Sequence, residues 1–391
     1  MKKMMKMVSV FLALVMVLSC LTACGSSAKK EEASASDGDK DVMLGLIGPM
    51  TGDYANYGTS VRNGAQIAVD EINAAGGVNG WTFSLNTQDS QGDPDSAVSA
   101  YGKLMDDGMD VSVGCVFSGE AQSVITVAAA DNILIVTPSS SAKDCITSND
   151  KAFRICFNDP AQGTASADYI ADNGLASKVA VFYQSDIDYS AGLYETFKAQ
   201  AGERGIEIVC EQTFTDGSKA DFSTQINAIR DSGAELVFMP FYAAEASTFL
   251  TQAKGKLDGM TFFGCDGMDG IQTKVSDMSL IEGLMMLTPF AADAEDEMTK
   301  AFVAEYAKRF DNAVPDQFAA DGYDAVYTIK AVMEKTGKTP ADADFTEALV
   351  KAMYEVEVEG LTGTMKWDQE REPNKAAKAM VFQNGVAVLA G

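Results

Sequence analysis

The stretch VMLGLIGPMTGDYANYGTSVRNGAQIAVDEINAAGG, residues 42–77, changes its hydrophobic period halfway along. Residues 42–48 form a short apolar run, which predicts a buried strand. Apolar side chains then recur on one helical face, at Val61, Ala65, Ala68, Val69 and Ile72. Gly76 and Gly77 follow, and glycine commonly ends a helix. The stretch therefore predicts a strand followed by a helix, which is the repeating unit of an α/β fold.

The same alternation continues along most of the chain. Further strand-like runs lie at 81–90, 111–118 and 133–138, and helical segments separate them. After residue 163 the pattern restarts, with runs at 178–184, 206–214, 234–242 and 260–267. Strands that alternate with helices of about 10 to 15 residues indicate parallel sheets covered on both faces. We therefore predict an α/β protein with two Rossmann-like lobes, each built on a parallel sheet.

The C-terminal part adds an apolar run, three helical segments and a hairpin turned by Asn384 and Gly385. This helix-rich material is most easily placed if the chain returns to the first lobe and then crosses again to the second. Three crossings would make a hinge, which we expect near Ile155, Leu287 and Met365. The predicted lobes are 41–155 with 290–363, and 156–289 with 364–391.

The composition excludes several classes of protein. The 391 residues contain no histidine, which removes the commonest general base and rules out a Ser-His-Asp hydrolase. The formal net charge is -26, which would repel nucleic acid. Gly45, Gly48 and Gly52 do not have the spacing of a dinucleotide fingerprint. We therefore expect no catalysis, no cofactor and no nucleic-acid partner.

The N-terminus has the pattern of an exported lipoprotein. Three lysines precede the apolar stretch 7–18, which is shorter than the ~20 residues of a membrane span and typical of a secretory signal. The sequence LTAC at 21–24 resembles the bacterial lipoprotein signal, in which the cysteine is lipidated. We expect a signal peptide at 1–23, a lipid on Cys24 and a flexible tether at 24–40. The protein would then be extracytoplasmic, lipid-anchored to the outer face of the bacterial cytoplasmic membrane.

The remaining cysteines suggest no disulfide framework. They are Cys115, Cys145, Cys156, Cys210 and Cys265, an odd number without C-x-x-C spacing. Most stand in apolar stretches, where a buried free thiol is the expected state. We therefore predict neither a zinc site nor a redox site.

Ligands of open α/β sheets bind beyond the carboxyl ends of the strands. Ser118 stands where a predicted strand becomes a helix, so backbone N–H groups and the positive end of the helix dipole point outward there. Together with the serines at 139–141, it would make a neutral pocket suited to a carboxylate. Asp266 ends another apolar run, where it would be solvated, bonded to backbone or paired with a cation. Carboxylate donors on one lobe and an acid on the other would fit a zwitterion.

The order of these segments resembles a known family. GLIGPMTGDYANYG (45–58), VGCVFSGEAQ (113–122), ILIVTPSSSA (133–142) and GYDAVYTI (322–329) are similar to the branched-chain amino-acid-binding proteins of ABC transporters, which have the periplasmic binding protein type I fold. The resemblance runs from about Asp41 to the C-terminus. It implies a monomeric binding protein that captures a free amino acid between two hinged lobes and delivers it to permease subunits.

The resemblance also implies roles for individual residues. Ser118 matches a serine that binds the ligand carboxylate through its hydroxyl and backbone N–H, and Ser141 matches a hydroxyl that touches the same carboxylate. Ser139 matches a position that offers its carbonyl to the ligand ammonium. Asp266 matches an acidic position, usually glutamate, that pairs with this ammonium. The aromatic residues at positions that line the cleft or the side-chain pocket are Tyr57, Tyr189, Tyr242 and Phe318.

Two departures leave the ligand's side chain open. Asp266 is one methylene shorter than glutamate, which shifts the amino group or admits a water molecule. Gly92 and Phe117 occupy positions where some members of the family have a disulfide, so that bridge is absent and Phe117 changes the shape of the pocket. A second hypothesis keeps the fold but assigns it to sensing an amide, urea or a short peptide. A neutral ligand would not need Asp266.

Overall fold

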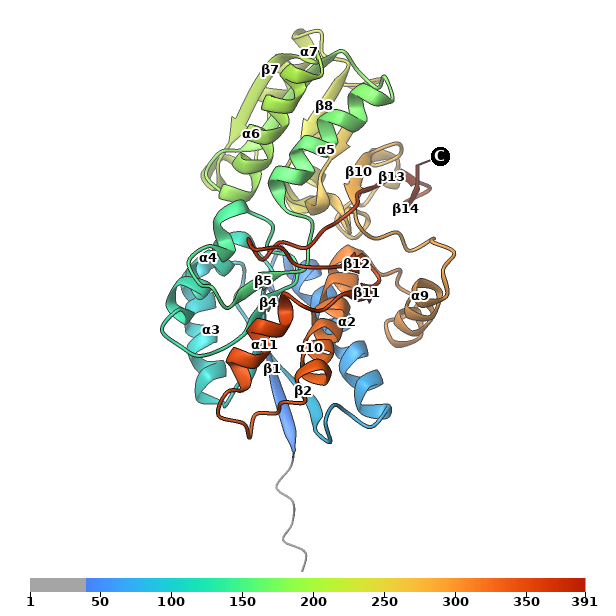
Figure 1. Ribbon diagram of the computed structural model, residues 1–391. Coiled ribbons are helices and arrows are strands. Elements are labelled where there is room, and N and C mark those ends of the chain that lie inside the picture. The colour runs from blue at the N-terminus through green and yellow to red at the C-terminus, as the bar shows by residue number, and fades with distance from the viewer. Residues whose placement is uncertain (1–39, 391) are drawn as a thin grey trace, which may run out of the picture. The chain divides into compact units, whose positions relative to one another are not determined.

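The computed structural model describes residues 40–390 (Figure 1). The predicted signal peptide, the lipidation site Cys24 and the tether up to residue 39 lie outside these residues. Within residues 40–390, no helix combines the length and the apolarity that crossing a membrane requires. Two mainly parallel sheets with helices on both faces organise this part of the chain, as the sequence predicts.

The first sheet has five parallel strands in the order β2-β1-β3-β4-β5. They are β1 (Asp41–Gly48), β2 (Thr82–Asp89), β3 (Val111–Cys115), β4 (Ile135–Thr137) and β5 (Ala152–Arg154). Successive side chains of a strand face opposite sides of the sheet. Leu46 therefore packs into one hydrophobic cluster and Ile47 into another.

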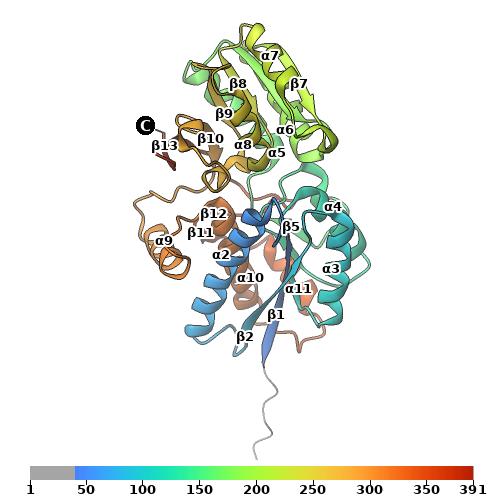
Figure 2. The ribbon, with the colours of Figure 1, turned by 180° about the vertical axis from the view of Figure 1, so that it is seen from behind.

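Helices cover both faces of the first sheet (Figures 1 and 2). The cluster with Leu46 includes α2 (Ala55–Ala74) and α10 (Gln317–Thr336), and the cluster with Ile47 includes α3 (Pro94–Asp106) and α4 (Ser118–Ala128). α10 belongs to the C-terminal part of the chain, yet it packs lengthwise on α2. The other elements of this part are α9 (Glu297–Arg309), α11 (Phe345–Met353), β11 (Val358–Gly360) and β12 (Gly363–Met365).

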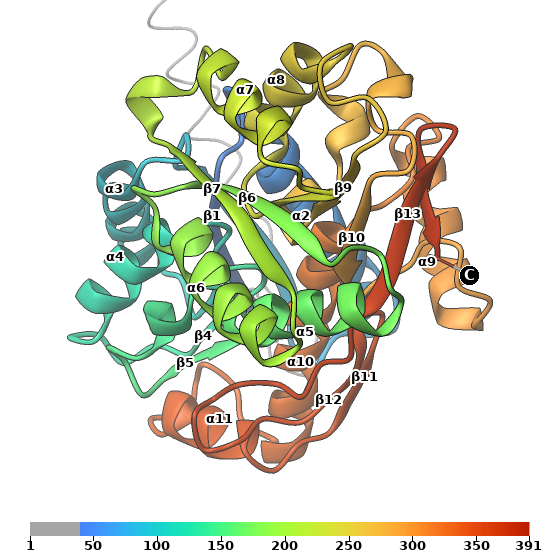
Figure 3. The ribbon, with the colours of Figure 1, turned by 90° about the horizontal axis from the view of Figure 1, so that it is seen from above.

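The second sheet is mixed, with the strand order β14-β13-β10-β9-β8-β6-β7. Its strands are β6 (Lys178–Gln184), β7 (Glu207–Phe214), β8 (Leu236–Met239), β9 (Thr261–Gly264), β10 (Met285–Thr288), β13 (Lys378–Gln383) and β14 (Val386–Leu389). β13 and β14 are the antiparallel edge hairpin (Figure 3). The two residues of its turn, Asn384 and Gly385, both have positive φ, at 54° and 80°, as the tight turn of such a hairpin requires.

Four helices flank the second sheet: α5 (Asp159–Asp172), α6 (Asp188–Glu203), α7 (Ser223–Asp231) and α8 (Ala243–Ala253). Val181 packs in the cluster with α5 and α6, whereas Phe182 packs with α7 and α8. Short 3-10 turns lie at η1 (Lys143–Ile146), η2 (Asp216–Ser218), η3 (Asp266–Met268), η4 (Ile271–Thr273) and η5 (Met278–Leu280). The bounds of the lobes and the three hinge positions stay predictions.

Candidate functional site

Ser118 is the first residue of α4, directly after β3, and it is buried. Its Oγ accepts hydrogen bonds from the backbone N–H groups of Ser141 and Ala142, at 3.1 and 3.0 Å. No hydrogen bond donated by this hydroxyl is found among the described residues. The hydroxyl hydrogen and the first N–H groups of α4 are therefore left for an anion at this end of the helix.

The serine run is tied to the neighbouring strand. The Ser139 hydroxyl donates to the carbonyl of Val116 at 2.9 Å, and the Ser140 hydroxyl donates to the carbonyl of Cys115 at 2.8 Å. These two hydroxyls therefore hold the loop in place, which agrees with a ligand role for the Ser139 carbonyl rather than for its hydroxyl. Ser141 is buried as well, and its carbonyl accepts from the N–H of Asp159 at 2.9 Å.

Asp266 follows β9 and begins the turn η3. Its Oδ1 accepts from the Tyr189 hydroxyl at 2.6 Å and from the Gly267 N–H at 2.8 Å. Burial raises the pKa of this carboxyl, and the hydrogen bonds from its neighbours offset part of that rise. The groups that favour its charged form are hydroxyl, amide and thiol groups, not Lys or Arg. Asp266 is therefore a buried carboxyl that lacks a cationic partner among residues 40–390.

Aromatic rings connect the two sheets around these residues. The Tyr57 hydroxyl donates to the carbonyl of Gly267 at 2.6 Å and accepts from the N–H of Ala243 at 2.8 Å. The remaining ring contacts join Tyr57 to Phe318 at 4.8 Å, Tyr242 to Phe117 at 4.6 Å and Tyr242 to Tyr189 at 4.8 Å, measured between ring centroids. All eight residues predicted from the sequence thus lie in one connected region.

The sequence analysis missed a second contact between the loop after β1 and helix α8. The Tyr54 hydroxyl donates to Glu245 at 2.6 Å and accepts from Lys219 at 3.3 Å. Lys219 also lies over the Tyr54 ring, 5.5 Å from its centroid. This charged triad holds the two sheets together on the α8 side. Its only sequence signal is that Tyr54 is the first tyrosine of DYANYG, the stretch whose second tyrosine is Tyr57.

Asp159 is the other residue that the sequence analysis missed. It is fully buried at the start of α5, and neither carboxyl oxygen has a hydrogen-bond partner among the described residues. Burial and then the charge of Asp266 raise its pKa well above the usual range, and Ser141 and Arg154 offset part of the rise. A signal was present in the sequence, because Asn158 and Pro160 are typical of a helix start.

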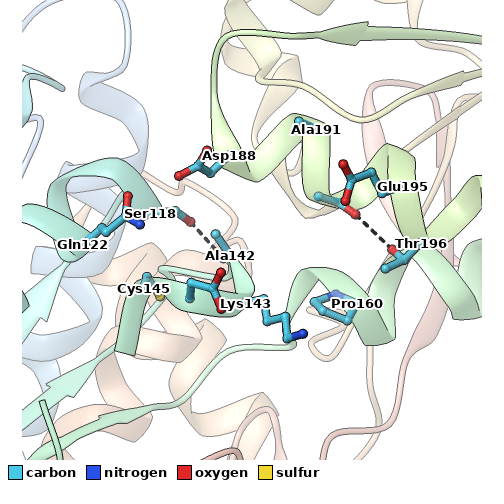
Figure 4. A pocket seen from close by; sticks show the side chains of 12 residues that line it. Ser118, Gln122, Ala142, Lys143, Cys145, Pro160, Asp188, Ala191, Glu195 and Thr196 are labelled. Atoms are coloured by element: carbon cyan, nitrogen blue, oxygen red, sulfur yellow. Dashed lines mark hydrogen bonds between the residues drawn. The ribbon is translucent and has the colours of Figure 1, made fainter. Parts of the chain in front are cut away.

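Two cavities flank the beginning of α4. One, of about 370 Å³, runs from Ser118 and Gln122 to Asp188 and Glu195 on α6 (Figure 4). The other, of about 400 Å³, is lined by Tyr54, Phe117, Tyr189 and Tyr242, with Asp188 again on its wall. Both volumes fall in the range of small-molecule sites.

The described residues offer no cluster of three or more His, Cys, Asp or Glu side chains that could hold a metal ion. The five cysteines from Cys115 to Cys265 are all free thiols; four are buried and Cys210 is half-buried.

A pair of buried carboxyls lies where η3 and η4 meet α10. Asp316 caps α10 and accepts from the Ser60 hydroxyl at 2.8 Å, while Asp269 accepts from the N–H of Gln317 at 2.8 Å. Burial raises the pKa of Asp316 to about 6. Burial and the adjacent Asp316 charge raise the pKa of Asp269 to about 8. Burial and the neighbouring carboxyl therefore favour the protonated form of Asp269 in the folded protein.

These raised pKa values predict that the ligand-free protein loses stability as the pH rises. A carboxyl whose pKa is higher in the folded state binds its proton more tightly there, so its contribution disappears between about pH 4 and pH 8. We expect the Tm to fall by roughly 5 °C from pH 5 to pH 8.5, for a loss of a few kcal/mol. Asp269→Asn keeps an oxygen acceptor for Gln317 and should make this fall smaller. An equal fall in both proteins, measured by calorimetry, would rule out Asp269 as its source.

Comparison with known proteins shows that this chain is similar to binding proteins. The family model described as periplasmic binding protein matches residues 41–386. A Leu/Ile/Val-binding protein homolog of Brucella melitensis is 31% identical over 337 residues, which cover 86% of this chain and 89% of that protein.

Solved structures of binding proteins are similar to this chain as well. The branched-chain amino acid transporter substrate binding protein LivJ of Streptococcus pneumoniae, in complex with isoleucine, is 26% identical with a TM-score of 0.81, and the match covers 90% of this chain and 99% of that one. A solute binding protein of an ABC transporter from R. palustris, in complex with benzoate, is 22% identical with a TM-score of 0.80, covering 90% and 96%. That second likeness concerns the fold alone.

Proposed function

The chain belongs to the periplasmic binding protein family, as a solute-binding protein of an ABC transporter, and from this premise we propose that it captures a free amino acid, branched-chain or related, and delivers it to permease subunits. Proteins of this family bind their solutes and are not enzymes. The relatives that are named for leucine, isoleucine and valine support an amino acid as the ligand. The lipoprotein signal at Cys24 supports capture outside the cytoplasm, close to the permease.

The observation that carries the proposal is the buried carboxyl of Asp266. A carboxylate taken out of water is strongly destabilised unless a cation pairs with it. Tyr189 and Gly267 donate to its Oδ1, and no Lys or Arg stands among the groups that favour its charge. We infer that the ammonium group of the ligand supplies that charge.

Ser118 would bind the carboxylate, at the opposite end of the ligand from the ammonium. The start of α4 offers N–H groups and a hydroxyl, which suit the carboxylate of a zwitterion. The ligand would therefore bridge a residue of the first sheet and a residue of the second. Charge-assisted hydrogen bonds worth about 1.5 to 3 kcal/mol each then favour the state in which the two sheets are close.

The test is a thermal-shift screen of the purified protein with the twenty amino acids, followed by calorimetry. An amino acid that binds should raise the Tm by mass action. Its α-hydroxy acid analogue, which has a hydroxyl in place of the ammonium, should bind at least about 10-fold more weakly, because one charge-assisted bond is lost.

The outcomes separate the alternatives. Equal affinity for the amino acid and its hydroxy analogue would contradict the role of Asp266. Binding of benzoate, urea or an amide, with no response to any amino acid, would replace the amino acid as the ligand class.

A further inference from the structure

The carboxyl of Asp159 lacks a partner within residues 40–390, which indicates that the ligand carries a positive charge in addition to the one that would pair with Asp266. The side chain is 0% exposed, and neither Oδ1 nor Oδ2 has a hydrogen-bond partner among the described residues. Buried polar atoms of native proteins nearly always have a partner, and a buried charge is paired with an opposite one. An atom pair left in this way directly behind the wall of a cavity indicates that a bound molecule completes it.

The nearest guanidinium does not supply the missing partner. Arg154 donates to the carbonyls of Ser141 and Ala142, and its Nε lies 3.1 Å from the carboxylate of Glu372. One positive charge is thus matched by one negative charge. Asp159 and Asp266 remain, and the charge of Asp266 raises the pKa of the Asp159 carboxyl by repulsion. The ammonium of a neutral amino acid would offset only one of these two carboxyls.

Asp159 lies directly behind the wall of the cavity of about 370 Å³. Pro160 and Gly192 form this part of the wall. A Cβ placed on Gly192 would find Asp159 Oδ2 as its nearest neighbour, at 4.0 Å. The absence of a side chain at Gly192 therefore leaves the carboxyl close to the cavity.

Both cavities beside α4 carry an excess of acidic residues. The cavity of about 370 Å³ has Asp144, Asp188 and Glu195 against one basic residue, Lys143 (Figure 4). Among the described residues that line the cavity of about 400 Å³, acidic side chains and aromatic rings occur without any Lys or Arg. Acidic walls concentrate cations, and the faces of Tyr and Phe rings attract them. A ligand held by Asp266 and Ser118 that extends its side chain into either cavity would therefore meet a negative electrostatic potential.

We propose that the ligand carries a second cationic group, on its side chain, that pairs with Asp159, so that the preferred substrates are basic amino acids. This inference rests on the proposed function, because it takes the α-ammonium and the α-carboxylate to be held by Asp266 and Ser118. It adds the class of the side chain, which neither anchor determines.

The test compares charged and neutral ligands of equal size. Calorimetry of the full-length protein should give tighter binding of L-arginine than of L-citrulline, and of L-lysine than of L-norleucine. The expected preference is about 10- to 100-fold, the worth of one charge-assisted bond. Asp159→Asn should reduce the preference to less than about 3-fold, mainly by weakening the basic ligands. Asp106→Asn, at the end of α3, removes an exposed charge outside both cavities and should change affinity by less than about 3-fold, because exposed charges are screened.

The outcomes separate a failure of the second cationic group from a failure of the proposed function. Tight binding of isoleucine or norleucine, with no gain from the side-chain charge, would overturn the second cationic group and leave the proposed function standing. Binding of no amino acid at all would overturn both. An equal loss for basic and neutral ligands in Asp159→Asn, with an unchanged Tm, would assign Asp159 to the α-ammonium instead. If that variant does not fold, the wild-type comparison of arginine with citrulline still decides the question.

Discussion

Asp266→Asn is expected to weaken amino-acid binding by more than about 100-fold. The substitution keeps an oxygen at Oδ1 for the Tyr189 hydroxyl and the Gly267 N–H, so the local structure should persist. It removes the charge that would face the ligand ammonium, and stranding one partner of a buried ion pair costs about 3 to 5 kcal/mol. Calorimetry with the best ligand from the thermal-shift screen measures the loss.

The matched control is Asp106→Asn. Asp106 is an exposed carboxylate at the end of α3, so its neutralisation changes the net charge by the same amount. We expect less than a 2-fold change in affinity, because solvent and salt screen an exposed charge. Unchanged affinity in Asp266→Asn, with a Tm equal to that of the wild type, would remove Asp266 from the ligand site.

Gly64→Ala is expected to destabilise the protein by about 3 kcal/mol, which lowers the Tm by roughly 5 to 10 °C. Helices α2 and α10 touch along their backbones: a Cβ at Gly64 would lie 1.8 Å from the carbonyl oxygen of Ala319. The contact is reciprocal, since a Cβ at Gly322 would lie 2.3 Å from the carbonyl oxygen of Val61. Backbone atoms cannot rotate away, so the helices must separate.

Gly102→Ala provides the control for this prediction. Gly102 is an exposed residue within α3, and a Cβ there would meet nothing within 4 Å. Alanine favours a helix interior by about 0.5 to 1 kcal/mol over glycine, so this variant should gain slightly in stability. Thermal and denaturant unfolding measure both variants. A Gly64→Ala protein as stable as the wild type would show that the two helices can move apart at little cost.

The strands were largely predictable because short apolar runs alternate regularly with helical segments along the chain. The run at 178–184 coincides with β6. Asp93 caps α3, since its side chain accepts from the N–H of Ser96 at 2.8 Å. Helix α5 was missed, because its small residues, DPAQGTASADYIAD, give no clear apolar stripe. Tertiary packing between α6 and the second sheet, rather than the local pattern, stabilises it.

The sequence predicted candidate positions for the site but not their balance of charges. Ser118, the serine run and Asp266 are candidates because residues that follow buried strands gather at one edge of a sheet. Asp159 follows β5 in the same way, yet its lack of a partner depends on Arg154 being occupied by Ser141, Ala142 and Glu372. Glu372 is more than two hundred residues distant along the chain, so no local pattern could reveal that pairing.

By itself the sequence determined the α/β class, the two sheets, the absence of histidine chemistry and the positions from which ligand-binding side chains would come. These follow from hydrophobic period, composition and the geometry of parallel strands, which act over short stretches of chain. Only the tertiary structure decided that α10 packs on α2 through Gly64 and Gly322, that the predicted hairpin pairs with β10 at the edge of the second sheet, and that Asp159 and Asp266 are buried without a cation among the described residues. Burial and charge pairing depend on segments that are distant in sequence, and folding alone brings those segments together.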